Sequence, residues 1–229
     1  MRLMHPNFST PIVLKEGLVN VLIAESPEMF RGIVLDLTAQ CAGQEGDFVL
    51  SLAYTPVPIA KNAALLREPL FPDFSSRRIV NSFLSGLEKT AAGEALYLDT
   101  YTIQSQLASY YEKLLSAFDA PLTVDADIAM AALLKAANLR VDTVGTTPLE
   151  RLSMWMDVHA SLGLASVFIF VNLKSCFSTP ELETLYREIK LKKYRVLLIE
   201  PTLYPDLRKE ECTLLFDTDL CEVINETEN

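Results

Sequence analysis

The stretch SVFIFVNLKSCFSTPELETLYREIKLKKYRVLLIEP, residues 166–201, decides the fold class of this chain. Two uncharged apolar runs, Ser166–Val171 and Val196–Ile199, lie on either side of a segment with helical spacing. Apolar runs that do not alternate with polar residues are typical of strands buried on both faces, as in parallel sheets covered by helices. The stretch therefore predicts a strand, a helix of about four turns and a second, parallel strand.

Three helix starts are marked by a Ser or Thr followed by proline: Ser26-Pro27, Thr147-Pro148 and Thr179-Pro180. The hydroxyl caps free backbone N–H groups, and proline fits the first helical position. Thr147 also has Glu150 three residues later, which is the pattern of a capping box. We expect the first of these helices to run to about Cys41.

The remaining pattern divides the chain into two kinds of sequence. Short β-favouring segments predict strands, whereas the middle of the chain has helical spacing of its apolar residues. We predict an α/β domain from residues 1–74 and 146–229, and a helical insertion at residues 75–145 whose aromatic and methionine side chains form its core. The predicted strands outside the opening stretch are Ile12–Leu14, Leu18–Ala24, Asp47–Tyr54, Ala63–Leu70 and Thr213–Phe216, with Thr55–Pro58 as a connection.

Composition narrows the class of protein. The formal net charge is −10 and the sequence pI is about 4.7, which taken alone argues against nucleic acid binding. An acidic chain can nevertheless concentrate positive charge along one groove. The four cysteines are scattered, which favours free thiols, and no apolar run has the ~18–20 residues that span a bilayer. We expect a cytoplasmic protein without a membrane segment.

Catalytic signatures are missing from the sequence. No G-x-x-x-x-G-K-[ST] phosphate loop is present, so ATP or GTP hydrolysis by that route is not expected. Glu200 ends a predicted buried strand at the position that holds magnesium in such enzymes, and Asn172 ends the other; we interpret both as structural. The two histidines, His5 and His159, give no Ser/His/Asp arrangement, and His159 on its amphipathic helix is expected to be an interior residue.

Acidic residues in the helical insertion are candidate metal ligands. Asp125 and Asp127 are two residues apart, and Asp119 comes six residues before Asp125. Three such carboxylates could converge on a hard, oxygen-seeking cation. Spacing alone favours a different role, in which Asp125 or Asp127 caps a helix beginning near Ile128.

Basic residues are candidate phosphate contacts. Arg77 and Arg78 begin a predicted helix, where the dipole disfavours cations, and Lys135 and Arg140 bracket the end of another. Helix-dipole compensation explains the remaining cluster, at the end of the helix in the opening stretch. That cluster comprises Lys190, Lys192, Lys193 and Arg195.

A colinear set of segments resembles a known family. The segments are NFSTPIVLKEGLVNVLIAES, SFLSGLEK, LTVDADI followed by LLKAANLRV, FIFVN, STPELETLYREIKLKKY and RVLLIEP. Their order and spacing resemble the CRISPR-associated DNA-end-binding proteins of type II-A systems over roughly residues 3–224. No single segment is as specific as a phosphate loop, so the resemblance depends on the whole set.

The resemblance implies a fold and a function. The fold is a degenerate P-loop-NTPase-like α/β head with a mostly parallel sheet and an inserted α-helical leg. Family members form a ring-shaped homotetramer that encloses double-stranded DNA entered from an end, and calcium stabilises the ring. They serve spacer acquisition in antiviral defence, with the CRISPR integrase proteins and the RNA-guided effector nuclease as partners. No enzymatic activity and no nucleotide cofactor are implied.

The resemblance also assigns residues, although only in part. Asp125 and Asp127 fall where the family carries metal-binding acids, and Asp119 lies near another. Pro121 and Thr123 stand where the family often has acids, so the calcium site departs from the family pattern. Lys135 and Arg140 match basic positions, whereas Arg77 and Arg78 are assigned to DNA binding by the charge argument alone.

Two other functions remain open. The first is a metal-dependent nuclease or nucleotide hydrolase with Asp125, Asp127 or Glu200 as metal ligands, although two-metal chemistry needs more convergent carboxylates than this chain displays. The second is a protein-interaction scaffold that never retains DNA.

Overall fold

A computed structural model describes residues 1–125, 128–204 and 211–225 of the chain. The chain forms two compact units. The first, the sheet unit, comprises Met1–Asp73 and Thr143–Asn229, and the second, the helical unit, comprises Phe74–Asp142. In the described ranges no helix is both long and apolar enough to cross a membrane.

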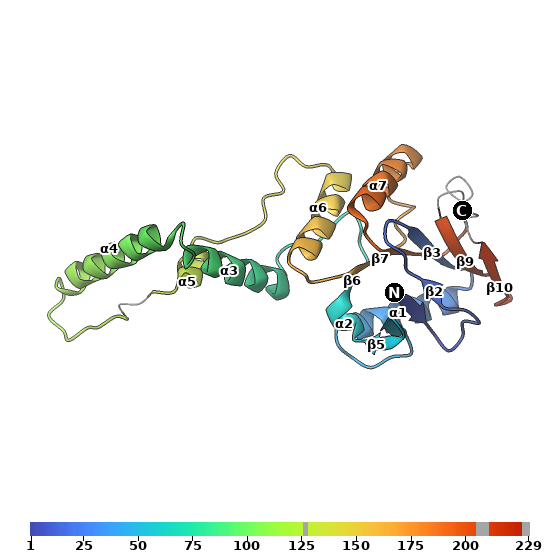
Figure 1. The fold of residues 1–229 in the computed structure, drawn as a ribbon, viewed down its shortest axis with the longest axis horizontal. Coiled ribbons are helices and arrows are strands. Elements are labelled where there is room, and N and C mark those ends of the chain that lie inside the picture. The colour runs from blue at the N-terminus through green and yellow to red at the C-terminus, as the bar shows by residue number, and fades with distance from the viewer. Residues whose placement is uncertain (126–127, 205–210, 226–229) are drawn as a thin grey trace. The chain divides into compact units, whose positions relative to one another are not determined.

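A six-stranded sheet is the centre of the sheet unit (Figure 1). Its strand order is β10-β9-β3-β8-β7-β6, and only the edge strand β10 runs antiparallel to its neighbour. The prediction of a mixed α/β fold with a mostly parallel sheet is therefore confirmed. The strands are β3 (Val19–Ala24), β6 (Ala63–Leu66), β7 (Val167–Val171), β8 (Val196–Glu200), β9 (Glu211–Phe216) and β10 (Glu222–Asn225).

The opening stretch of the sequence forms β7, the helix α7 (Thr179–Lys192) and β8, as predicted. Every residue of both strands is buried, and the strands pair in parallel. The capping residue of α7 is Ser178, which forms a capping box with Glu181, whereas we had expected Thr179. Both hydroxyl residues precede Pro180, and backbone geometry places the first helical turn one residue earlier.

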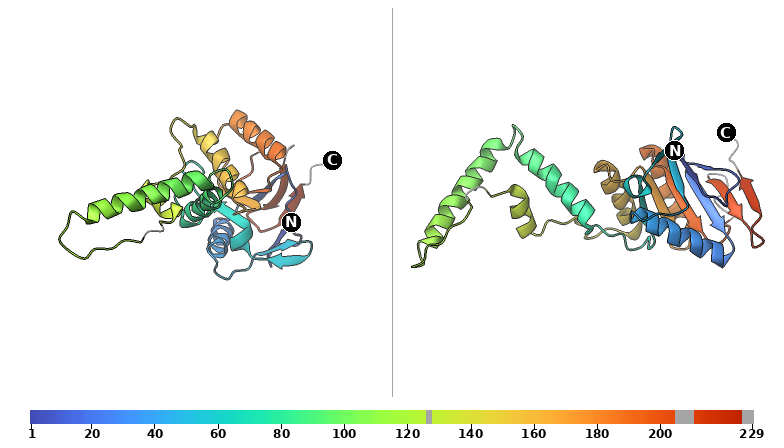
Figure 2. Two further views of the ribbon diagram at one scale, coloured as in Figure 1. Left: turned by 60° about the vertical axis from the view of Figure 1, so that its left-hand side comes forward. Right: turned by 90° about the horizontal axis from the view of Figure 1, so that it is seen from below.

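Alternate side chains of β7 face opposite layers. Val167, Ile169 and Val171 belong to the core cluster that includes helix α1 (Pro27–Cys41). On the other face, the Trp155 ring of helix α6 (Pro148–Ser161) lies 6.0 Å from both the Phe168 and Phe170 rings. Thr147 forms the predicted capping box of α6, and Ser26 caps α1. Figure 2 shows the sheet between these helical layers.

A second, four-stranded sheet with the order β2-β1-β4-β5 packs into the same core through Leu3 and Leu50. All three strand pairings of this sheet are antiparallel, and the short helix α2 (Ile59–Asn62) follows it in the chain. The sequence did not predict β1, β5 or β10. The turn between β4 and β5 consists of Ala53 and Tyr54, with φ of 47° and 68°, so it lacks the Gly or Asn that normally marks such a turn. The strands are β1 (Arg2–Met4), β2 (Ile12–Val13), β4 (Val49–Leu52) and β5 (Thr55–Val57).

The helical unit contains α3 (Arg77–Ala91), α4 (Tyr97–Leu115) and α5 (Met130–Ala136). Helix α3 packs against α5, and the Glu88 carboxylate accepts the Ala131 N–H at 3.3 Å. No residue of α4 is buried, so the expectation that its aromatic side chains form a core is wrong within one copy of the chain. The described helices of this unit do not enclose α4.

A network of charged groups is buried inside the sheet unit. The Lys174 ammonium donates to Glu211 at 2.7 Å, and the Tyr186 hydroxyl donates to the other oxygen of that carboxylate at 2.7 Å. Glu200, at the end of β8, is 0 % exposed and accepts the Lys174 backbone N–H at 3.0 Å. Its second oxygen has no hydrogen-bond partner among the described residues. Burial raises the pKa of Glu200 to about 7, although hydrogen bonding and the Lys174 charge act in the opposite direction.

We predict that Glu200→Gln stabilises the protein at alkaline pH. The folded chain holds the Glu200 proton up to a pKa of about 7, whereas the unfolded chain releases it near 4.5. The free energy of unfolding therefore falls as pH rises from about 4.5 to 7. The variant lacks this loss. Above pH 7 its free energy of unfolding should therefore exceed that of the natural chain by up to roughly 3 kcal/mol.

Urea unfolding of the variant and the natural chain at pH 5 and pH 8 measures this gain. The control is Glu183→Gln, which changes an exposed carboxylate on α7 and is expected to alter stability by less than about 0.5 kcal/mol. A Glu200→Gln variant that keeps the full pH dependence would contradict the assignment.

Candidate nucleic-acid interface and metal-binding residues

The four basic residues proposed for DNA binding all belong to the helical unit. Arg77 and Arg78 occupy the first turn of α3, directly after the N-cap residue Ser76, as expected. Lys135 lies in the last turn of α5, and Arg140 follows in the segment after that helix. All four side chains are exposed. They are therefore available to a large polyanion.

Arg77 and Arg78 lie at the start of α3, whereas Lys135 lies at the end of α5, which packs against α3. Glu88, near the end of α3, contacts Ala131, near the start of α5. After α5 the chain runs back in the direction of the start of α3 (Figure 1, Figure 2).

The proposed metal ligands follow α4. Asp119 and Asp125 are exposed and lie in irregular chain, and Asp127 lies outside the described residues. The capping role that spacing favoured is not observed for Asp125. Helix α5 begins at Met130, and its N-cap residue, Ala129, makes no side-chain capping bond. Asp125 therefore does not cap this helix.

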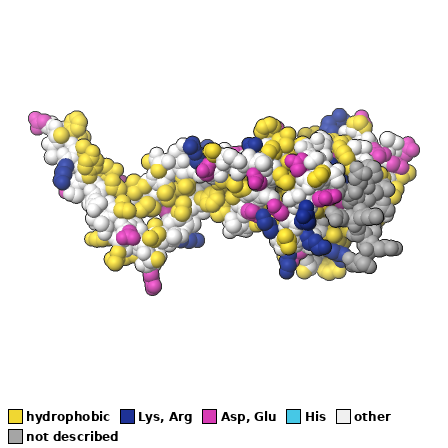
Figure 3. Space-filling view, turned by 90° about the horizontal axis from the view of Figure 1, so that it is seen from above, with side chains coloured by type: hydrophobic (Ala, Val, Ile, Leu, Met, Phe, Trp, Pro, Cys, Tyr) yellow, Lys and Arg dark blue, Asp and Glu magenta, His cyan; other side chains and the backbone are white. Residues whose placement is uncertain are grey.

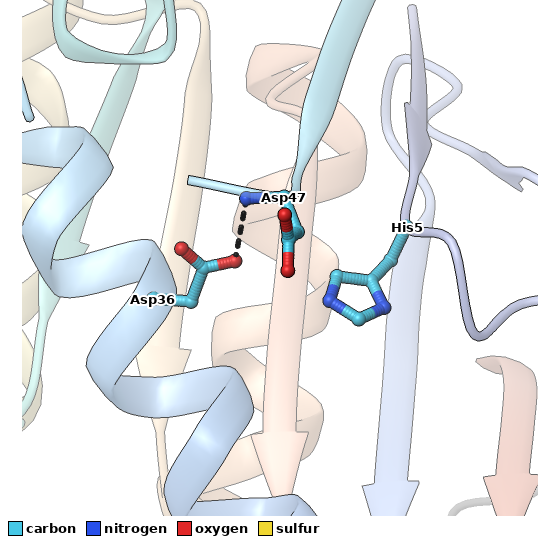
Figure 4. Close-up of side chains that lie close together, drawn as sticks. All are labelled: His5, Asp36 and Asp47. Carbon is cyan, nitrogen blue, oxygen red and sulfur yellow. Dashed lines mark hydrogen bonds between the residues drawn. The ribbon is translucent and has the colours of Figure 1, made fainter. Parts of the chain in front are cut away.

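A different set of possible ligands converges in the sheet unit. His5, Asp36 and Asp47 each offer one atom, and these atoms lie within 4.8 Å of one another (Figure 4). They come from the end of β1, from α1 and from the segment before β4. Among the described residues no other group of three His, Cys, Asp or Glu side chains converges in this way. Sequence reasoning missed it because the three residues are far apart in the chain.

Hydrogen bonds show what this cluster can do. The Asp47 N–H donates to Asp36 at 3.1 Å, and the Asn7 N–H donates to Nδ1 of His5 at 3.2 Å. A neutral His5 then carries its proton on Nε2, so neither ring nitrogen offers a free lone pair to a metal. A cation bound at this position would have to replace the Asn7 hydrogen bond. The mixture of imidazole and carboxylate also suits a transition metal better than calcium.

Glu200 and His159, two of the residues considered for catalysis, lie in the protein interior. Glu200 is fully buried, and its carboxylate accepts the backbone N–H of Lys174 in the loop that follows β7. His159 is buried as expected, with Nδ1 2.8 Å from the Trp155 carbonyl and its ring 4.1 Å from the indole. Asn172 is exposed and adopts a left-handed backbone conformation at the end of β7. Neither Glu200 nor His159 is accessible to a substrate in this arrangement.

Most of the chain is similar to one known protein family. Residues 40–220 match the family of CRISPR-associated proteins described as Cas_Csn2. No curated protein gives a significant match. Similar solved structures include a metal-chelate type ABC transporter in an inward-facing conformation, which is 13 % identical; the alignment covers 100 % of this chain and 84 % of that chain with a TM-score of 0.46.

The family match includes α3, α4 and α5 of the helical unit and the strand–helix–strand stretch that decides the fold. It confirms the resemblance that the colinear segments indicate. Because the match spans most of its length, the chain belongs to the Csn2 family of CRISPR-associated proteins.

Proposed function

We propose that this protein binds double-stranded DNA ends without sequence preference and without catalysis, inside a calcium-stabilised tetrameric ring that supports CRISPR spacer acquisition. Membership of the Csn2 family over residues 40–220 is the observation that carries the proposal. The sheet unit then corresponds to a degenerate P-loop-NTPase-like head, and the helical unit to a leg. The integrase proteins and the RNA-guided effector nuclease are the proposed partners, and the cytoplasm is the proposed site of action.

The junction between β3 and α1 supports a role without nucleotide. Only Glu25 and Ser26 connect the strand to the helix, which leaves no glycine-rich loop to cradle phosphates. The Ser26 hydroxyl accepts the Met29 N–H at 3.4 Å, and Glu28 adds negative charge to the first turn. An anionic phosphate is therefore disfavoured at this helix start.

Charge in the helical unit supports binding to the DNA backbone. Arg77, Arg78, Lys135 and Arg140 are exposed, and contacts between such side chains and phosphates carry no sequence information. In a tetramer each side chain occurs four times. A ring can thus present enough positive charge to DNA although the chain as a whole has a formal charge of −10.

Exposed apolar side chains support the assembly of several copies. Helix α4 leaves Tyr97, Leu98, Tyr101, Ile103, Tyr110 and Leu114 exposed, and none of its residues is buried. Figure 3 shows hydrophobic side chains gathered on the surface of the helical unit. Apolar surface of this extent is typical of an interface. We propose that it is covered by another copy of the chain.

The metal site is the least complete part of the proposal. Asp119 and Asp125 are exposed and can reach a cation, but calcium usually takes about six to eight oxygen ligands, more than the two carboxylates supply even if both bind through both oxygens. Asp127 and groups from a second copy are the proposed additional ligands. The alternative of a metal-dependent nuclease or nucleotide hydrolase has less support, because Glu200 is buried and paired with backbone.

We predict that the protein retains linear duplex DNA and not closed circular DNA, and that reversing basic charges weakens this retention. Arg77→Glu with Arg78→Glu, and separately Lys135→Glu with Arg140→Glu, should weaken binding at least roughly tenfold and lower the salt dependence. Gel shifts at several salt concentrations measure both effects. Equal binding of linear and circular DNA would contradict the proposal.

The matched control is Lys89→Glu with Lys113→Glu, which makes the same charge change on exposed residues of the same unit. It should weaken binding by less than roughly threefold, since neither lysine is proposed to contact a phosphate and salt screens charges that make no direct contact. Equal losses in the control and in the two test variants would show that only total charge matters.

We also predict that charges on α4 break the assembly. Tyr110→Glu with Leu114→Glu should convert a tetramer into smaller species, because buried carboxylates without partners oppose association. Both residues are exposed in the single chain, so its folding should not change. Light scattering with and without a calcium chelator gives the mass.

Ser105→Glu with Ser109→Glu is the matched control, since it adds the same charges to exposed polar positions of α4. It should leave the mass of a tetramer unchanged. A natural chain that is monomeric in calcium, or a Tyr110/Leu114 variant that remains tetrameric, would contradict the proposed interface.

A further inference from the structure

A cavity of about 740 Å³ lies in the sheet unit, and none of its lining residues is among those proposed for DNA or calcium. One wall is the segment Thr10–Leu18, which contains β2, and the floor is the face of β3, β9 and β10 that carries Leu214 and Ile224. The end of α7 completes the wall. Cavities of about 300–1,000 Å³ are typical of small-molecule sites.

The arrangement of the layers explains why this part of the sheet is open. Helix α1 packs over β6, β8 and β3. The neighbouring strands β9 and β10 extend the sheet beyond these contacts, and the segment Thr10–Leu18 stands as a wall beside them. Two apolar side chains at the cavity remain accessible to solvent, Val13 at 41 % and Ile224 at 46 %. The cavity therefore has an apolar surface that a ligand can cover.

Three lysine side chains line the cavity and make it positively charged. Lys15, Lys190 and Lys193 line it, and none of them forms an ion pair within the described part of the chain. The carboxylate of Glu16 also lines it but is paired with Arg195 at 2.6 Å. These side chains together leave an excess of about three positive charges in a chain whose total is −10.

A carboxylate beyond the lining reduces this excess at one edge. Glu222 accepts hydrogen bonds from the Ser9 N–H at 2.7 Å and from the Thr10 hydroxyl at 3.1 Å. Partial burial alone would raise the pKa of Glu222, but these bonds outweigh it and lower that pKa. Glu222 is therefore anionic, and its two oxygens accept from the Ser9 backbone and the Thr10 hydroxyl.

Glycine brings two of the lysines to the same cavity. Gly17 has φ of 71°, and a Cβ at this position would lie 3.2 Å from the Lys190 carbonyl oxygen. The Gly17 N–H donates to the Tyr194 carbonyl at 2.9 Å. The segment that carries Lys15 thus lies directly against the end of α7. A larger residue at position 17 would separate the two.

Polar groups in the floor can orient a ligand. Asn20 is 3 % exposed, and its side-chain N–H donates to the Val196 carbonyl at 3.4 Å. Cys212 occupies the paired position on β9 and is half-buried. A few polar groups within an apolar surface are typical of pockets that select a ligand by orientation.

We propose that this cavity binds a small organic anion, a phosphate or carboxylate that carries an apolar body. The anionic group would meet Lys15, Lys190 and Lys193, and the apolar body would cover Val13 and Ile224. Duplex DNA fits less well, because a duplex cannot enter a cavity of this size and would touch only its rim. The site is independent of the proposed DNA function, and either proposal can fail without the other.

The test uses two fluorescent probes that differ by one charge. The first, 8-anilinonaphthalene-1-sulfonate, has an anionic group on an apolar body, and N-phenyl-1-naphthylamine is its uncharged analogue. Alkylation of the full chain by iodoacetamide, quantified by mass spectrometry, reports where they bind. The sulfonate should slow alkylation of Cys212 at least roughly threefold while that of the exposed Cys221 is unchanged, because only Cys212 lines the cavity.

Charge reversal tests the anionic part of the site. Lys15→Glu with Lys190→Glu should raise the sulfonate concentration needed for Cys212 protection at least roughly tenfold, with the uncharged probe changed less than roughly twofold. Lys89→Glu with Lys113→Glu is the control and should have no effect. Ile224→Gln tests the apolar part separately and should weaken both probes.

Three results would overturn the proposal. The first is equal protection of Cys212 and Cys221 by the sulfonate, and the second is protection of Cys212 that persists in the Lys15/Lys190 variant. The third is an uncharged probe that protects Cys212 as well as the sulfonate does. Thermal unfolding of each variant, expected within roughly 3 °C of the natural chain, shows that the fold is intact.

Discussion

Burial of β7 and β8 on both faces is the constraint on which the sheet unit depends. Each strand must place alternate side chains in two different layers, so α1 and the four-stranded sheet cover one face and α6 covers the other. A parallel pair also needs a crossing connection, which α7 provides. Loss of either layer would expose a row of large apolar side chains to water.

The same burial determines what happens to the polar groups near these strands. Lys174, Glu211 and Tyr186 lie inside the protein and are satisfied by one another. Glu200 accepts a backbone N–H and keeps one oxygen without a partner among the described residues. In a nucleotide-binding enzyme of similar topology, the carboxyl ends of the strands face a ligand. In this chain the acid at the end of β8 instead binds the loop after β7.

Sequence reasoning succeeded where the signal was local and failed where a partner decided the outcome. The starts of α1 and α6 follow from Ser26 and Thr147, whose capping bonds form within one turn. β1 is short and pairs with β4, which is distant in the sequence, whereas β5 and β10 are short strands that pair with the neighbouring strands β4 and β9. The lysines of α7 are a further example. Helix-dipole compensation explains why they occur near the end of the helix, but only the fold shows that Lys190 and Lys15 line the same cavity.

Sequence by itself determined the fold class, the central strand–helix–strand element and the family, because uncharged strands, caps and colinear segments are encoded in neighbouring residues. Tertiary structure alone decided which polar residues are accessible. Glu200 and Glu183 are both glutamates of the same stretch, yet one is buried and the other exposed. His5, Asp36 and Asp47 converge only because β1, α1 and the start of β4 pack together. Accessibility and convergence depend on contacts between distant segments, and a linear pattern does not contain them.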